Sequence, residues 1–99
     1  MTITKTQENG KITLTLNGRL DTTTAPSLQE DIVPAIDEAN EIVVDFADLT
    51  YVSSAGLRVL LMAEKMAKAS DKTMILSNIS EEIMEVFEMT GFANILTFA

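Results

Sequence analysis

The fold is decided by one stretch of the chain, Asp48-Leu49-Thr50-Tyr51-Val52-Ser53-Ser54-Ala55-Gly56-Leu57. A β-branched apolar run at residues 41–46 precedes it, and apolar residues at helical spacing over residues 57–66 follow it. The stretch therefore marks the passage from a strand covered on both faces into a helix. This order indicates a parallel βαβ unit with a right-handed crossover.

Ser53 and Ser54 stand at the expected N-terminus of that helix. The first four N–H groups of a helix have no partner within it, and its dipole leaves partial positive charge there. An anion added to Ser54 would be stabilised at this position, as in a phosphorylation switch. The alternative is that Ser54 only caps the helix, because serine is a favoured capping residue. The local sequence leaves both interpretations open.

Two alternating segments begin the chain and predict a pair of strands. Residues 2–7 and 11–17 alternate polar and apolar, and Asn9-Gly10 between them is a hairpin turn signal. After turn and capping residues, a first amphipathic helix is expected to begin near Thr24, with Pro26 in its first turn.

The last third of the chain repeats the strand and helix pattern. Residues 73–76 form a short apolar strand, Ser80 caps a helix, Gly91 ends it, and a final strand covers residues 95–98. The predicted order is ββαβαβαβ. This order gives one α/β domain over residues 1–99, a mixed sheet of about five strands with helices packed on it.

Composition excludes several classes of function. With 15 acidic and 7 basic residues the net charge is −8, which argues against partners such as nucleic acid or an anionic membrane. The chain has no cysteine and no histidine, so the usual zinc ligands, catalytic thiols and imidazole bases are missing. We therefore expect no enzyme, no catalytic residues, no cofactor and no metal. We also expect a cytoplasmic monomer, since no run is apolar enough for a signal or a membrane span.

Two groups of residues receive structural interpretations. Asp45 and Asp48 flank the end of a strand, and we interpret them as turn residues rather than metal ligands. The methionines at five positions are interpreted as members of the core, and the alternative places one or two of them in an exposed interaction patch. These are Met62, Met66, Met74, Met84 and Met89.

Four motifs in this order resemble the STAS domain family, and specifically its free-standing bacterial anti-sigma factor antagonists. They are Gly18-Arg19-Leu20-Asp21 before a threonine-rich helix start, residues 42–49 (Ile-Val-Val-Asp-Phe-Ala-Asp-Leu), residues 53–57 (Ser-Ser-Ala-Gly-Leu) and residues 87–92 (Phe-Glu-Met-Thr-Gly-Phe). The resemblance covers essentially the whole chain.

The resemblance implies a function in partner switching. An unphosphorylated antagonist binds an anti-sigma factor that is also a serine kinase, and a sigma factor is released. Phosphorylation, here implied on Ser54, ends this binding, and a PP2C-type phosphatase resets the switch. Ser53 stands where many members carry aspartate, and Ala55 where they carry a second hydroxyl. The other class kept open is a phosphorylation-independent STAS binding subunit, for example of a lipid-transport ATPase complex.

The candidate partner-binding surface combines a loop and a helix start. Its residues are Asp21, Thr22, Ser53, Ser54, Ala55, Gly56, Leu57 and Arg58. The resemblance implies that Asp21 pairs with a basic group of the kinase, whereas the sequence alone also allows a turn aspartate that binds local N–H groups. The neighbouring threonines, Thr22, Thr23 and Thr24, are interpreted as turn and cap hydroxyls. Arg58 is a contact candidate on the helix surface.

Overall fold

The computed structural model describes residues 1–99 and contains four strands, three α-helices and one short 3-10 helix. In chain order these are β1 (Thr2–Glu8), β2 (Lys11–Leu20), α1 (Ala25–Glu38), β3 (Glu41–Val52), α2 (Ser54–Ala69), β4 (Thr73–Ser77), α3 (Glu81–Thr90) and the 3-10 helix η1 (Phe92–Asn94). No helix is long and apolar enough to cross a membrane.

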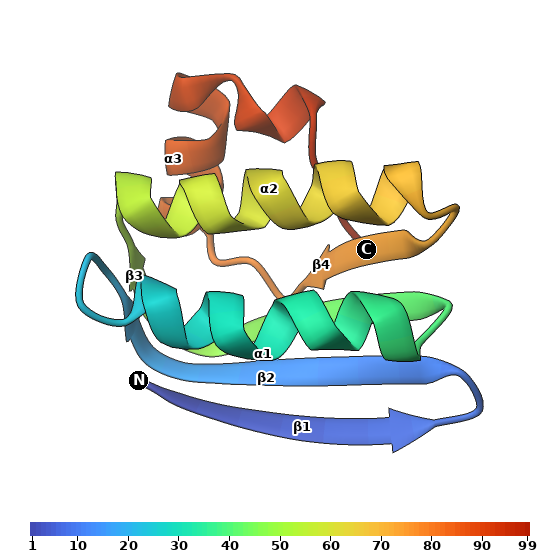
Figure 1. Ribbon diagram of the computed structural model, residues 1–99. Helices are drawn as coiled ribbons and strands as arrows, with labels where there is room; N and C mark the ends of the chain where they lie inside the picture. The colour runs from blue at the N-terminus through green and yellow to red at the C-terminus, as the bar shows by residue number, and fades with distance from the viewer.

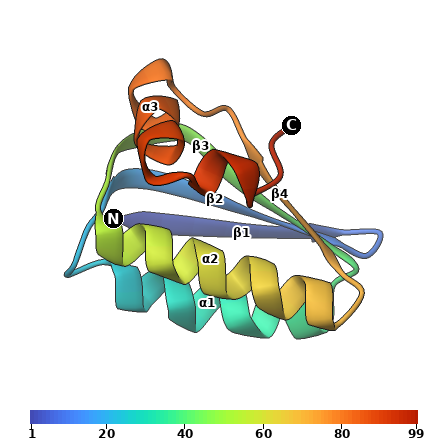
Figure 2. The same cartoon turned by 90° about the horizontal axis from the view of Figure 1, so that it is seen from above.

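The four strands form one mixed sheet in the order β1-β2-β3-β4. β1 and β2 are antiparallel, joined by the turn at Asn9 and Gly10, where φ is positive at both residues. β2, β3 and β4 run parallel. Helices α1 and α2 lie side by side along one side of the sheet, and α3 lies at the β4 end, away from β1 (Figures 1 and 2).

The helix boundaries follow the predicted signals. Thr24 is the N-cap of α1, with Pro26 in the first turn. Ser80 caps α3 by accepting a hydrogen bond from the Ile83 amide, and Gly91 ends α3 in the left-handed conformation with φ of 81°. The helices and the sheet enclose a core of 25 buried apolar residues. Alternate residues of the strands supply much of it, among them Ile12, Leu14, Leu16, Ile42, Val44, Phe46, Met74 and Leu76.

β3 is longer than the expected strand at residues 41–46, because it continues to Val52. It contains one residue more than β2 at each of two register shifts, so Asn17 pairs with Asp48 and Arg19 with Tyr51. Asp45 and Asp48 are therefore strand residues, and their interpretation as turn residues is wrong. The Asp45 carboxylate accepts hydrogen bonds from the Ala47 amide and the Asn78 side chain.

The expected final strand at residues 95–98 is reduced to a single bridge between Leu76 and Phe98. Residues 92–94 form η1 instead, and the Leu96 amide continues the helical pattern by donating to the Phe92 carbonyl. The methionine interpretation is confirmed for Met74, which is fully buried, and in part for Met62, Met66 and Met84, which are half-buried and packed against the core. It is wrong for Met89, which is 86% exposed.

Candidate functional site

The junction between β3 and α2 fixes the two serines in different positions. The Ser53 amide donates to the Leu20 carbonyl at 2.8 Å, which holds Ser53 at the end of the sheet. Ser53 is the N-cap of α2, and its hydroxyl oxygen accepts a hydrogen bond from the Gly56 amide at 3.3 Å. Ser54 is the first helical residue and is exposed. The interpretation of Ser54 as the cap is therefore wrong, since Ser53 has that role.

Gly56 permits a close approach between α2 and β2. A Cβ atom on Gly56 would lie 2.5 Å from Leu20 Cγ and 3.3 Å from the Leu20 carbonyl oxygen. Gly56 and the next residue, Leu57, are buried. Gly56 and Leu57, which the sequence placed on the candidate partner-binding surface, therefore face the core instead. They hold the start of α2 against the end of β2.

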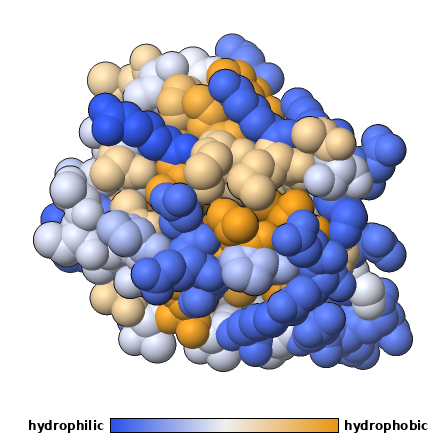
Figure 3. Space-filling model, viewed as in Figure 1, coloured by the Kyte–Doolittle hydropathy of each residue, from blue (hydrophilic) through white to orange (hydrophobic).

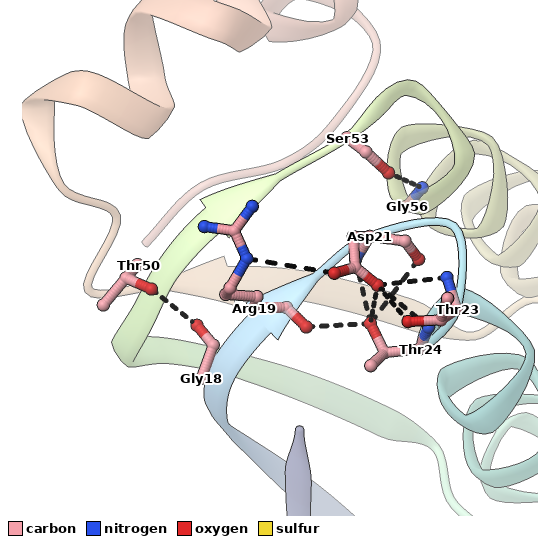
Figure 4. Close-up of polar contacts among 8 residues, drawn as sticks. All are labelled: Gly18, Arg19, Asp21, Thr23, Thr24, Thr50, Ser53 and Gly56. Carbon is pink, nitrogen blue, oxygen red and sulfur yellow. Dashed lines mark hydrogen bonds and ion pairs between the residues drawn. The ribbon is translucent and has the colours of Figure 1, made fainter.

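The loop between β2 and α1 lies beside this junction, as Figure 4 shows. Asp21 organises the loop through one carboxylate oxygen. Its Oδ1 accepts hydrogen bonds from the Thr23 amide at 3.0 Å, the Thr23 hydroxyl at 2.7 Å and the Thr24 amide at 3.1 Å. The Thr23 hydroxyl is the main cause of a lowered pKa of Asp21, with smaller contributions from the amides, so the carboxylate is ionised. Asp21 thus has the local N–H partners of a turn aspartate.

The second oxygen of Asp21 faces a residue that the sequence interpretation did not include. Arg19 Nε lies 3.8 Å from Asp21 Oδ2, and the Arg19 guanidinium lies 4.2 Å from the centre of the Tyr51 ring. Tyr51 is 41% exposed. A cation over an aromatic face is attracted to the ring electrons. The sequence shows Arg19 in the Gly18-Arg19-Leu20-Asp21 motif. It does not show the strand register that brings Arg19 opposite Tyr51.

The other predicted residues lie around these two loops. Thr22 is exposed in the turn, Ala55 is half-buried, and Arg58 is exposed one turn into α2. The Thr24 hydroxyl donates to the Arg19 carbonyl at 2.8 Å and accepts from the Asp21 amide, and so joins the end of β2 to the start of α1. The Asp21 carboxylate in the loop thus lies beside the guanidinium and phenol that the ends of β2 and β3 contribute through Arg19 and Tyr51.

The electrostatics of the α2 N-terminus suit an anion. The first turn of α2 contains no acidic residue. The amides of Ser54 and Ala55 precede the first bond of the helical ladder, so they have no acceptor within the helix. A phosphoryl group on the exposed Ser54 hydroxyl would meet these donors and the positive end of the dipole.

Comparison with known proteins gives consistent results. Residues 2–99 match the STAS domain family. The anti-sigma-B factor antagonist of Bacillus subtilis (strain 168) is 30% identical over 90 residues, which cover 91% of this chain and 83% of that protein. The anti-sigma-B factor antagonist of Listeria monocytogenes serovar 1/2a is 27% identical over 93 residues, or 93% of this chain and 82% of that protein.

The fold is similar to that of SpoIIAA in both its unphosphorylated and its phosphorylated form. The anti-sigma factor antagonist SpoIIAA in its unphosphorylated form superposes with a TM-score of 0.84 at 22% identity, covering 99% of this chain and 88% of that one. The phosphorylated form of the Bacillus cell fate determinant SpoIIAA has a TM-score of 0.78 at 22% identity, covering 99% and 91%. With a family match over residues 2–99 and the same strand and helix order, this chain belongs to the STAS domain family.

Proposed function

We propose that this protein is an anti-sigma factor antagonist controlled by phosphorylation of Ser54. The unphosphorylated form binds an anti-sigma factor that is a serine kinase, and the bound kinase releases its sigma factor. Phosphorylation of Ser54 ends this binding, and a PP2C-type phosphatase restores it. The observation that supports the proposal most directly is the exposure of Ser54 at a helix start whose cap is already formed by Ser53.

The position of Ser54 explains how phosphorylation can act without unfolding the domain. A phosphate adds nearly two negative charges and three acceptor oxygens. At the first turn of α2 the charge meets a favourable dipole, and the turn itself contains no acidic residue. Ser54 faces solvent, so a phosphate on its hydroxyl lies outside the core contacts that Gly56 and Leu57 make in this turn. The fold is retained, and the change is confined to the surface.

The effect on the partner follows from the same geometry. A partner surface that packs against a small hydroxyl must accommodate bulk and charge once Ser54 is phosphorylated. A desolvated unfavourable charge contact costs several kcal/mol, so affinity falls by about a hundredfold or more. The relatives named as anti-sigma factor antagonists support the identity of this partner as an anti-sigma factor.

Asp21 contributes a fixed negative charge to the proposed contact. Three hydrogen bonds to Oδ1 hold its carboxylate in place, and its lowered pKa keeps it ionised. We propose that a basic group of the kinase approaches the side of Oδ2, where Arg19 now lies at 3.8 Å. The turn role and the partner role are compatible, because they use different oxygens.

The test is phosphorylation of the purified protein by each serine-kinase anti-sigma factor encoded in the same genome, with Mg-ATP and peptide mass spectrometry. We expect phosphate on Ser54 alone. Ser54→Ala should remain folded, accept no phosphate and bind the kinase constitutively, whereas Ser54→Asp should bind about a hundredfold more weakly. Full phosphorylation of Ser54→Ala, or kinase binding by Ser54→Asp at the wild-type level, contradicts the proposal. Stable copurification with an ABC ATPase instead would favour the phosphorylation-independent subunit.

A further inference from the structure

The outer face of α2 combines exposed basic residues with half-buried apolar ones. Arg58 and Lys65 are exposed, and Leu61, Met62 and Met66 beside them are half-buried. These five residues, here called the α2 strip, line an open hollow of about 380 Å³. Figure 3 shows the apolar surface over α1 and α2, bordered by hydrophilic side chains.

The charge of the α2 strip is opposite to that of its surroundings. Three of the 7 basic residues lie exposed on α2, because Lys68 follows one turn after the strip. The only acidic residue of α2, Glu64, is buried. The exposed charged residues of α1 and α3 are all acidic: Glu30, Asp31, Asp37 and Glu38 on α1, and Glu81, Glu82, Glu85 and Glu88 on α3. The strip is therefore a basic and apolar surface within an acidic molecule of net charge −8.

We infer that the α2 strip binds an acidic amphipathic helix of the anti-sigma factor, which extends the contact that begins at Ser54. This inference rests on the proposed function. Arg58 and Lys65 are seven residues apart, or about 10 Å along the helix, so they can meet carboxylates two turns apart on a partner helix. The apolar residues of the strip can receive an apolar side chain of that helix, and methionine adapts its shape readily.

Two other occupants fit the charges less well. A second copy could place the acidic face of its α3 on the strip, but this brings together two molecules that each have a net charge of −8. An anionic membrane would attract Arg58 and Lys65 while repelling a molecule of net charge −8. A partner helix with acidic residues on one face can pair with Arg58 and Lys65 while it stays away from the acidic surfaces of α1 and α3.

The experiment measures binding of the purified kinase that phosphorylates Ser54. Lys65→Glu reverses one charge of the strip at an exposed position outside the candidate partner-binding surface. Lys11→Glu makes the same change at the start of β2 and is the matched control. We expect Lys65→Glu to weaken binding about tenfold, Lys11→Glu to change it by less than about twofold, and a carboxylate-to-lysine change on the partner helix to restore the affinity of Lys65→Glu.

The outcomes separate this inference from the proposed function. If Ser54→Asp weakens binding while Lys65→Glu and Lys11→Glu behave alike, the inference is overturned and the proposed function stands. If neither the wild type nor Ser54→Ala binds any anti-sigma factor, the proposed function fails and the inference falls with it. Binding to phosphatidylserine vesicles, or self-association in sedimentation, overturns the inference if Lys65→Glu abolishes it without weakening kinase binding.

Discussion

Helices α2 and α3 begin with the same cap but with opposite charge in the first turn. Ser53 accepts a hydrogen bond from the Gly56 amide at 3.3 Å, and Ser80 accepts one from the Ile83 amide at 3.2 Å. The first turn of α3 contains Glu81 and Glu82, so its dipole is already balanced, whereas that of α2 contains no acidic residue. The comparison shows that the first turn of α2, unlike that of α3, places no acidic side chain at the positive end of its helix dipole.

The two helices also differ in how their third residue meets the rest of the fold. In α3 this residue is Ile83, whose side chain is buried in the core. In α2 it is Gly56, where a Cβ atom would lie 2.5 Å from Leu20 Cγ. The start of α2 is therefore pressed against β2, and this contact places Ser54 at the surface beside the Asp21 loop.

The largest effect is expected from Gly56→Ala, because the added methyl group cannot fit beside Leu20. We expect a loss of about 1–3 kcal/mol in the free energy of unfolding, measured by urea denaturation. Leu20→Ala removes the atoms that clash and should make the double variant less destabilised than the sum of the two single variants. Strictly additive losses would contradict the close approach of α2 and β2.

The caps of α2 and α3 should contribute equally to the free energy of unfolding, even though the charges in their first turns differ. Ser53→Ala and Ser80→Ala each remove one side-chain acceptor from a helix N-terminus, and each should cost about 1 kcal/mol of unfolding free energy. Ser54→Ala, one residue further on, should cost much less, as thermal unfolding followed by circular dichroism would show. A cost for Ser54→Ala equal to that of Ser53→Ala would mean that Ser54 shares the capping role.

The sequence predicted the caps better than it predicted the strands, for a physical reason. Capping depends on one side chain and an amide three residues away, so Ser80 and Gly91 could be recognised locally. Alternation along β3 fails where the register shifts, because Ala47 and Asp48 are both exposed, as are Thr50 and Tyr51. A strand with such shifts loses its period-two pattern and resembles a turn.

Prediction of the candidate site from the sequence was limited by the same register shifts and by the unrecognised length of β3. Ser54 and Asp21 were identified from their motifs, but two adjacent serines are equally good caps in sequence. Their roles are decided by the continuation of β3 to Val52 and by the bond from the Ser53 amide to the Leu20 carbonyl. The contact of Arg19 with Tyr51 depends on a register shift, so no local pattern predicts it.

The acidic residues of the two helices provide a third comparison. α3 has its four glutamates exposed, while the single one of α2, Glu64, is 3% exposed. Glu64 Oε1 lies 3.8 Å from Lys68 Nζ, and Glu64 Oε2 has no hydrogen-bond partner. Burial raises the pKa of Glu64 above its ordinary value of 4.5, against an opposing effect of Lys68.

The raised pKa of Glu64 makes stability depend on pH in a defined direction. Below the ordinary value of 4.5 the carboxyl is protonated in both folded and unfolded states and costs nothing. As pH rises from 4.5 through the higher pKa of the folded state, the unfolded state loses its proton before the folded state does. The free energy of unfolding therefore falls over this range. Glu64→Gln should therefore gain about 1 kcal/mol relative to wild type between pH 4 and pH 7. Urea denaturation across this range, with the exposed Glu85→Gln as control, tests this, and parallel curves for wild type and Glu64→Gln would contradict it.

The smallest effect tests the comparison of the two helix starts most directly. Ser54→Asp places a carboxylate where α2 has none, and should raise the free energy of unfolding by about 0.3–1 kcal/mol at low ionic strength. Glu81→Gln removes a carboxylate from the equivalent turn of α3 and should lower it by a similar amount. Ser70→Asp, at the C-cap of α2, makes the same change at the negative end of the same helix and should destabilise the protein. These differences should shrink as salt is added, because exposed charges are screened. Equal effects of Ser54→Asp and Ser70→Asp would show that added charge, and not the open positive end of α2, determines the response, and would remove the electrostatic reason for holding a phosphate at Ser54.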